Sequence, residues 1–197
     1  MPVNITIFEK TDHIGGRTLT VNAYGDGTEP VELGASIFIR LNEILWNATE
    51  RYGLPLQDPD TEDDGLLAVW DGEKFVYQQD YKSWGWWNIV KLFWKYGTAP
   101  YRTQKLMQAT IAKFLNLYRS PYFPFRSLTT RAYELELTYV TGQTGQQFLA
   151  QNSVSGRFAH DIVQASTRVN YVSNLAHIHG LDTMVGRMHI LHNLSCS

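Results

Sequence analysis

The residue types best suited to chemistry lie close to the start of the chain. Residues 4–9 alternate apolar and polar side chains, which predicts a strand that ends at Glu9. Gly15 and Gly16 follow six residues later, with Arg17 beside them. In dinucleotide-binding folds an acidic strand tip accepts hydrogen bonds from ribose hydroxyls, and glycines let the backbone approach a pyrophosphate. Either feature alone indicates an ordinary surface loop, but their combination at this spacing predicts a nucleotide site, to which Arg17 would add guanidinium donors.

Short β elements and one helix are expected to position these residues. Residues 18–23 predict a second short strand, and residues 25–27 predict a turn. Residues 31–39 form a further extended or loop stretch that contains Gly34. Residues 41–52 carry apolar side chains at helical spacing, and the glycine that follows is suited to end that helix.

The rest of the chain predicts a hairpin and then helices. Two β-rich runs, residues 66–70 and 75–77, are joined across an Asp-Gly pair, which favours a hairpin. Helices are predicted over residues 86–96, 104–118, 128–151 and 157–171, separated by Gly, Pro and Ser breaks. The acidic, turn-rich segment 58–64 marks the boundary between the β-rich part and the helical part.

Composition narrows the classes of function. The chain has 197 residues, of which 44% are hydrophobic and 13% aromatic, with a formal charge of −2. This balance lacks the basic excess of a nucleic-acid binder, so no nucleic-acid partner is expected. The single cysteine, Cys196, excludes a disulfide framework and a thiolate-rich metal site. The apolar runs are shorter than the roughly 18–20 residues of a membrane span.

Several of these segments resemble one family of flavoproteins. Residues 8–17, with the Phe-Glu-Lys and Ile-Gly-Gly-Arg runs, resemble the second strand and glycine pair of FAD-dependent amine-oxidase-type proteins. Residues 32–36, Glu-Leu-Gly-Ala-Ser, resemble a later flavin-contacting loop of that group. The Arg-Val-Asn-Tyr and Ile-His-Gly-Leu runs within residues 168–181, and the aromatic hairpin at 69–76, resemble the prenylcysteine oxidase (prenylcysteine lyase) branch. The likeness covers about residues 4–185.

The resemblance implies a fold, a cofactor and a set of binding residues. The fold is α/β, with a partial Rossmann-like FAD-binding domain over residues 1–57, a mostly helical substrate-domain portion over 58–185 and a divergent tail over 186–197. The cofactor is FAD. Glu9 would hold its adenosine ribose. Gly15, Gly16 and Arg17 would lie along its pyrophosphate, and Gly34, Ala35 and Ser36 would approach its flavin.

The resemblance also implies a reaction, oxidative cleavage of the thioether in S-prenyl-L-cysteine during the breakdown of prenylated proteins. Hydride would pass from the carbon next to sulfur to the flavin, and water would add to that carbon to give a prenyl aldehyde and free cysteine. Dioxygen would reoxidise the flavin and leave hydrogen peroxide. The glycine pair does not select a substrate, so another amine-oxidase-like oxidoreductase is one alternative. A non-catalytic fragment that binds FAD weakly or not at all is the other.

One part of the family pattern is missing. The acidic residue normally lies about 20 residues after the glycine-rich phosphate loop. Counting back from Glu9 therefore puts that loop, and the first strand before it, upstream of Met1. We expect the chain to be a truncated or mis-spliced product, and any secretory signal to lie upstream as well. The resemblance implies a lysosomal, vacuolar or other secretory compartment, in which the sequon at Asn47 would be open to glycosylation.

Histidines near the end of the chain offer a metal-site hypothesis. The residues concerned are His177, His179, His189, His192 and Cys196. Three of them lie in the divergent tail, and a second cysteine to pair with Cys196 is missing. Solvated side chains explain these residues better than zinc, so no metal site is predicted.

The tryptophan-rich helix at 86–96 allows three interpretations. One face carries Ile89, Leu92, Phe93 and Tyr96, with tryptophans 87 and 94 at its flanks and lysines 91 and 95 opposite. Core packing is the favoured interpretation. Peripheral membrane contact is the first alternative, because tryptophan and lysine commonly flank an apolar face at a membrane interface. Lining an isoprenoid groove is the second. No protein partner is indicated.

Overall fold

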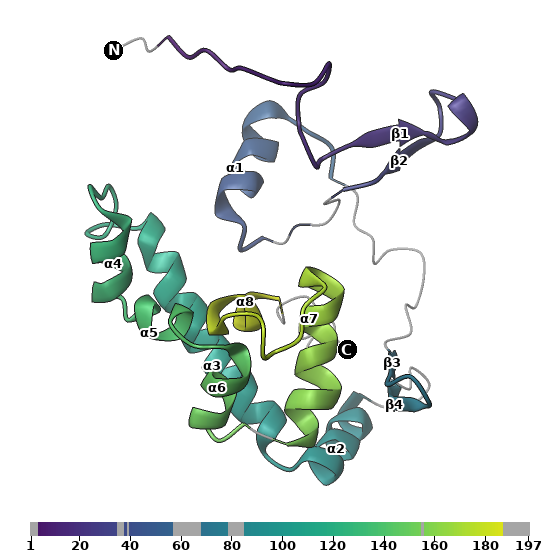
Figure 1. Cartoon of the computed structure of the whole chain (residues 1–197), viewed down its shortest axis with the longest axis vertical. Helices are drawn as coiled ribbons and strands as arrows, with labels where there is room; N and C mark the ends of the chain where they lie inside the picture. Colours follow the sequence, from purple (N-terminus) through teal and green to yellow (C-terminus); the bar gives the residue numbers. More distant parts are fainter. Residues whose placement is uncertain are drawn as a thin grey trace. The chain divides into compact units, whose positions relative to one another are not determined.

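The computed structural model describes residues 4–34, 38, 40–56, 68–78, 85–154 and 156–186. The chain divides into two compact units, Met1–Asp58 and Pro59–Ser197 (Figure 1). Among these described residues, the first unit carries a hairpin, a 3₁₀ turn (Ala23–Gly25) and an α-helix, and the second carries a hairpin followed by helices. This mixture of helices and strands fits the α/β class.

Unit 1 is built on a short hairpin and a helix. Strands β1 (Thr20–Asn22) and β2 (Pro30–Glu32) pair antiparallel, with Val21 opposite Val31. Helix α1 (Glu43–Tyr52) ends at Gly53, whose φ of 61° is the left-handed conformation that glycine adopts readily. The predictions of a strand within 18–23 and a helix over 41–52 are therefore confirmed.

The strand predicted over residues 4–9 is wrong for the described chain. These residues form no strand, and their apolar side chains are exposed, with Phe8 at 93%. A strand exists only where a neighbour supplies hydrogen bonds to its backbone. Among the described residues, β1 and β2 pair only with each other, so residues 4–9 have no sheet to join.

Unit 2 begins with the predicted hairpin. Strands β3 (Ala68–Trp70) and β4 (Phe75–Gln78) pair antiparallel, with an irregularity between Val69 and Trp70. The Asp71 carboxylate closes the turn by accepting hydrogen bonds at 2.8 Å from the backbone amides of Glu73 and Lys74. Those two bonds hold the pKa of Asp71 below its usual value. The hairpin prediction is confirmed, although residues 66 and 67 lie outside the described part of the chain.

Helices make up most of the remaining described residues of unit 2. In chain order they are α2 (Gly85–Tyr96), α3 (Ala99–Leu115) with a 3₁₀ turn after it (Asn116–Tyr118), α4 (Leu128–Glu134), α5 (Leu137–Thr141), α6 (Gly145–Gln151), a π-helical turn (Ala159–Val163) that runs into α7 (Gln164–Tyr171), and α8 (Gly180–Val185). Helix α8 packs against α3, α5 and α6. The fully buried side chains of Leu149, Val163 and Met184 belong to the main core cluster.

The single helix predicted over residues 128–151 is wrong, because the chain turns twice within it. Glu136 adopts a left-handed φ of 57° between α4 and α5. Thr144 then starts α6 with a capping box, in which its side chain and that of Gln147 each accept the other's backbone amide. The turns place Leu135 and Leu137 in a second buried cluster. Apolar side chains keep their helical spacing through both turns, so the sequence pattern does not reveal the turns.

Two glycines allow α8 to approach α5 and α6 closely. A Cβ added at Gly145 would lie 2.1 Å from Oγ1 of Thr183, and one at Gly180 would lie 2.8 Å from the carbonyl oxygen of Val140. Either contact is shorter than real Cβ atoms tolerate. The helices meet where a bridge joins Thr144 to His179, so the absence of a side chain at both glycines is required by packing.

Candidate functional site

The carboxylate of Glu9 is organised by its own segment. Its Oε1 accepts hydrogen bonds from the backbone amides of Lys10 and Thr11, at 2.8 and 2.9 Å, and from the Thr11 hydroxyl at 2.9 Å. The Thr11 amide is the largest cause of a pKa for Glu9 below the usual value. Within the described residues Oε2 has no donor. An exposed, ionised carboxylate with one free oxygen is what a ribose diol would need.

The paired glycines form a tight turn after this segment. Gly15 has a φ of 121° and Gly16 one of 58°, and the Thr18 amide donates to the Gly15 carbonyl at 3.0 Å. A Cβ added at Gly15 would meet the Thr18 carbonyl oxygen at 2.8 Å, whereas one at Gly16 would meet open space. The backbone is therefore accessible at Gly16, although an L side chain there would be strained.

Hairpin β1–β2 brings the later loop onto the glycine turn. A Cβ at Gly34 would lie 2.1 Å from the carbonyl oxygen of Arg17, so the two backbones are in direct contact. The Leu33 amide also donates to the Leu19 carbonyl at 2.8 Å. Two segments predicted to touch the same cofactor thus lie together in unit 1. Ala35 and Ser36 lie outside the described residues.

The arrangement in unit 1 fits a dinucleotide. It presents an ionised carboxylate, open backbone at Gly16 and the exposed side chain of Arg17, whose guanidinium has no partner among the described residues. These groups match ribose hydroxyls and phosphates, respectively. Residues 4–9, which lead to Glu9, form no strand among the described residues.

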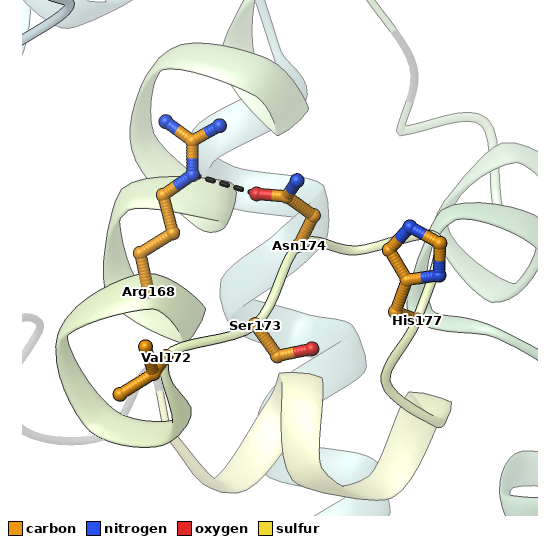
Figure 2. Close-up of a pocket in the computed structure, with 5 residues that line it drawn as sticks. All are labelled: Arg168, Val172, Ser173, Asn174 and His177. Carbon is orange, nitrogen blue, oxygen red and sulfur yellow. Dashed lines mark hydrogen bonds between the residues drawn. The ribbon is translucent and has the colours of Figure 1, made fainter.

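Unit 2 contains a polar pocket at the end of α7 that the sequence analysis did not identify. Arg168, Val172, Ser173, Asn174 and His177 line a volume of about 650 Å³. Figure 2 shows the guanidinium of Arg168 beside the amide of Asn174, and Nε donates to Oδ1 at 2.7 Å. A turn at Val172, whose φ is 52°, folds the chain back to allow this contact. Sequence spacing contains no signal for such a turn at a valine.

A second polar cluster joins α2 to the π-helical turn. The buried hydroxyl of Tyr96 donates to Oδ2 of Asp161 at 3.1 Å, and Nζ of Lys95 lies 4.0 Å from the same oxygen. Lys95 also donates to the Val76 carbonyl of β4. Burial, and then the charge of Asp161, raise the pKa of Tyr96. This cluster connects α2, β4 and the π-helical turn, so we assign it a role in the stability of unit 2.

The histidines have separate roles in the structure. His179 caps α8, because its Nδ1 accepts the Asp182 amide at 3.2 Å while Nε2 lies 3.1 Å from the Asp182 carboxylate. His177 instead lines the polar pocket. No group of three metal-ligating residues occurs within the described ranges. The remaining candidates, His189, His192 and Cys196, lie outside them.

Helix α2 divides between core and solvent. Tyr96 and Leu92 pack into the main cluster, as the core interpretation expects. Ile89 and Phe93 are exposed instead, and Trp94 is exposed to 88%. None of the helices in the described part of the chain combines the length and apolar character needed to span a membrane.

Comparison with known proteins matches both units. Residues 2–51 match the family model of an NAD(P)-binding Rossmann-like domain, and residues 79–188 match that of prenylcysteine lyase. The chain is 30% identical over 192 residues to prenylcysteine oxidase 1 of Bos taurus, an alignment that covers 93% of this chain and 36% of that protein. It is 28% identical over 185 residues to farnesylcysteine lyase of Arabidopsis thaliana, covering 85% and 35%. Human prenylcysteine oxidase 1 is 26% identical over 200 residues, covering 99% and 36%.

These matches confirm the resemblance stated from the sequence. The chain spans about a third of the length of the curated relatives it matches. The prenylcysteine lyase model covers more than half of the chain and includes the pocket at the end of α7. The chain belongs to the prenylcysteine lyase family.

Proposed function

We propose that this chain is part of an FAD-dependent thioether oxidase that cleaves S-prenyl-L-cysteine. One observation carries the proposal: a nucleotide-binding match and a prenylcysteine lyase match occur in order along the same chain, over residues 2–51 and 79–188. The names of the relatives, prenylcysteine oxidase and farnesylcysteine lyase, support this class of substrate. We propose the corresponding division into a nucleotide-binding portion, residues 1–57, and a substrate portion, residues 58–185.

The proposed reaction consumes one dioxygen and one water for each thioether. The C–S bond breaks, the carbon next to sulfur is oxidised to an aldehyde, and sulfur leaves as the thiol of cysteine. Dioxygen takes up two electrons and two protons and becomes hydrogen peroxide. When bound, FAD supplies the acceptor for the hydride on that carbon.

The residues proposed to hold FAD are those of unit 1. Glu9 would accept hydrogen bonds from the adenosine ribose through its free Oε2, because Oε1 is already saturated by the segment around Thr11. Gly15 and Gly16 would bring backbone close to the pyrophosphate, and Arg17 would neutralise its charge. Gly34, Ala35 and Ser36 are proposed to approach the flavin. The protein's tasks are to bind, orient and exclude water.

The test is reconstitution of the purified chain with FAD and farnesylcysteine. Flavin absorption that stays with the protein on gel filtration, together with formation of peroxide and aldehyde, supports the proposal. Glu9→Gln should weaken FAD binding several-fold. Glu29→Gln, an exposed glutamate in the same unit, is the matched control and should leave it unchanged.

Two other outcomes have distinct meanings. Flavin retention with oxidation of an amine and no cleavage of the thioether would favour another amine-oxidase-like oxidoreductase. A colourless chain that forms no peroxide would favour a non-catalytic fragment. Residues 4–9 give that second candidate its specific support, since they pair with no strand among the described residues and the side chain of Phe8 is exposed.

We also propose peripheral membrane contact through the exposed side chains of α2. The observation that favours it is the 88% exposure of Trp94, beside exposed Ile89 and Phe93. Phospholipid vesicles should co-sediment the chain and shift its tryptophan emission to shorter wavelength. Trp94→Ser should reduce both effects, whereas Tyr133→Ser, at an exposed aromatic on α4, should not. Absence of sedimentation with neutral and anionic vesicles would contradict this contact.

The proposed compartment is the lysosome, the vacuole or another secretory location. It rests on the family resemblance, and the exposed position of Asn47 on α1 is compatible with glycosylation there. Expression of the gene in its own cells, followed by glycosidase digestion, tests this. A mobility shift that Asn47→Gln abolishes would support it, and an unglycosylated cytosolic protein would contradict it.

A further inference from the structure

The pocket at the end of α7 holds hydrogen-bonding groups that the proposed function has not yet used. Nε of Arg168 is bound to Asn174, but the two terminal guanidinium nitrogens have no partner among the described residues. The hydroxyl of Ser173 and the ring of His177 likewise make no hydrogen bond to the described residues. In Figure 2 these groups all project from α7 and the loop that follows it. The pocket is thus lined by donors that remain available.

The charge of the pocket is positive. Its five lining residues include one guanidinium and no carboxylate. The acidic residue close by in sequence, Asp182, is engaged by His179 at 3.1 Å. Carbonyl oxygens at the C-terminal end of α7 favour a cation there, which accounts for the position of Arg168. The hydroxyl of Ser173 and the ring of His177 line the same pocket and can donate to an anion held by Arg168.

We propose that this pocket binds the α-carboxylate of S-prenyl-cysteine, an inference that rests on the proposed function. A guanidinium binds a carboxylate through two parallel hydrogen bonds, and Arg168 keeps its terminal nitrogens available for this. The pocket is open, since Arg168, Asn174 and His177 are exposed, so it can receive a charged group of a ligand without enclosing the whole molecule. The pocket lies in the prenylcysteine lyase segment and outside the nucleotide-binding segment, which favours substrate over cofactor phosphate.

The remaining lining residue is apolar. Val172 lies at the edge of the pocket and exposes 93% of its surface, so it offers a small apolar contact beside the polar groups. An acid to hold the α-ammonium group is missing from the lining, so that group stays in water or binds elsewhere. Recognition at this pocket therefore depends on the carboxylate.

The test compares S-farnesyl-L-cysteine with its methyl ester, which lacks the negative charge. Binding of each to the full chain is followed by NMR through the backbone amides of residues 172–177. We expect the acid to bind about tenfold more tightly than the ester, the effect of one charge-assisted contact. Arg168→Gln should abolish this preference and Arg168→Lys should retain part of it. Asn174→Ala breaks the bond to Nε but keeps the charge, and should retain most of the preference.

A second probe, propionate, separates this inference from the proposed function. If propionate shifts these amides only when Arg168 is present and farnesylcysteine does not bind, the carboxylate site stands and the proposed substrate is wrong. If acid and ester bind equally and Arg168→Gln changes neither, the substrate stands and the inference is overturned. If neither probe shifts these amides, the inference is also overturned. Circular dichroism of each variant identifies one that has failed to fold, in which case Arg168→Lys replaces Arg168→Gln.

Discussion

Replacement of Tyr96 by phenylalanine tests the polar cluster that joins α2 to the π-helical turn. The hydroxyl of Tyr96 donates to Asp161 at 3.1 Å, and the Tyr96 side chain is only 9% exposed. A buried hydrogen bond to a charged group contributes about 1.5–3 kcal/mol. We therefore expect Tyr96→Phe to lower the free energy of unfolding by about 2 kcal/mol at pH 8, measured by urea denaturation with circular dichroism.

The same substitution should change how stability depends on pH. Burial, and then the charge of Asp161, raise the pKa of Tyr96 in the folded protein, whereas an unfolded tyrosine ionises near pH 10. Above about pH 10 the unfolded state therefore binds fewer protons than the folded state, and stability falls by about 1.4 kcal/mol per pH unit. Tyr96→Phe lacks this loss. The difference between wild type and variant should shrink from about 2 kcal/mol at pH 8 to about 0.6 kcal/mol at pH 11.

Tyr133→Phe is the control for that experiment, because Tyr133 is exposed on α4 in the same unit and its hydroxyl makes no hydrogen bond to the described residues. Its denaturation curves should match those of the wild type at both pH values. Parallel pH profiles for Tyr96→Phe and wild type would refute the assignment of a raised pKa to Tyr96. A loss of less than about 0.5 kcal/mol at pH 8 would refute the contribution assigned to its hydrogen bond.

Three substitutions in α6 and at its N-cap test the stability of unit 2, each by urea denaturation. Thr144→Ala removes the capping box with Gln147 and should cost about 1 kcal/mol, and an unchanged midpoint would contradict that role. Gly145→Ala places a Cβ against Thr183 and should cost about 1–3 kcal/mol despite the better helix propensity of alanine, so a gain in stability would contradict the close approach. Phe148→Ala empties a buried site and should cost about 3–5 kcal/mol, and a loss below 1 kcal/mol would show that the site is not packed.

Sequence patterns predicted the elements that are stabilised by residues close to one another in the sequence. The helix over 41–52 and its end at Gly53 follow from apolar spacing and a glycine that adopts a left-handed φ. The hairpin follows from two β-rich runs around Asp71, whose carboxylate closes the turn by itself. Helix α3 starts at Ala99, before the predicted start at residue 104, because a proline fits the first turn of a helix and need not mark a break.

Elements that depend on distant partners were predicted poorly. Residues 4–9 have the alternation of a strand, but the described chain offers them no neighbouring strand. The range 128–151 has continuous apolar periodicity, yet a turn at Glu136 is needed for Leu137 to reach its buried cluster. Periodicity identifies the apolar face of an element and contains nothing about what covers that face.

The candidate sites likewise contain parts that depend on residues near in sequence and parts that depend on distant residues. The amino-acid sequence by itself determined the contacts of the Glu9 carboxylate and the glycine turn, because these hydrogen bonds join residues at most three positions apart. Only the tertiary structure placed Gly34 on the backbone of Arg17 and Tyr96 against Asp161, 65 positions away. Contacts across such separations form only when many elements pack at once. Their free energy therefore depends on the whole core, and the local spacing of residues does not predict them.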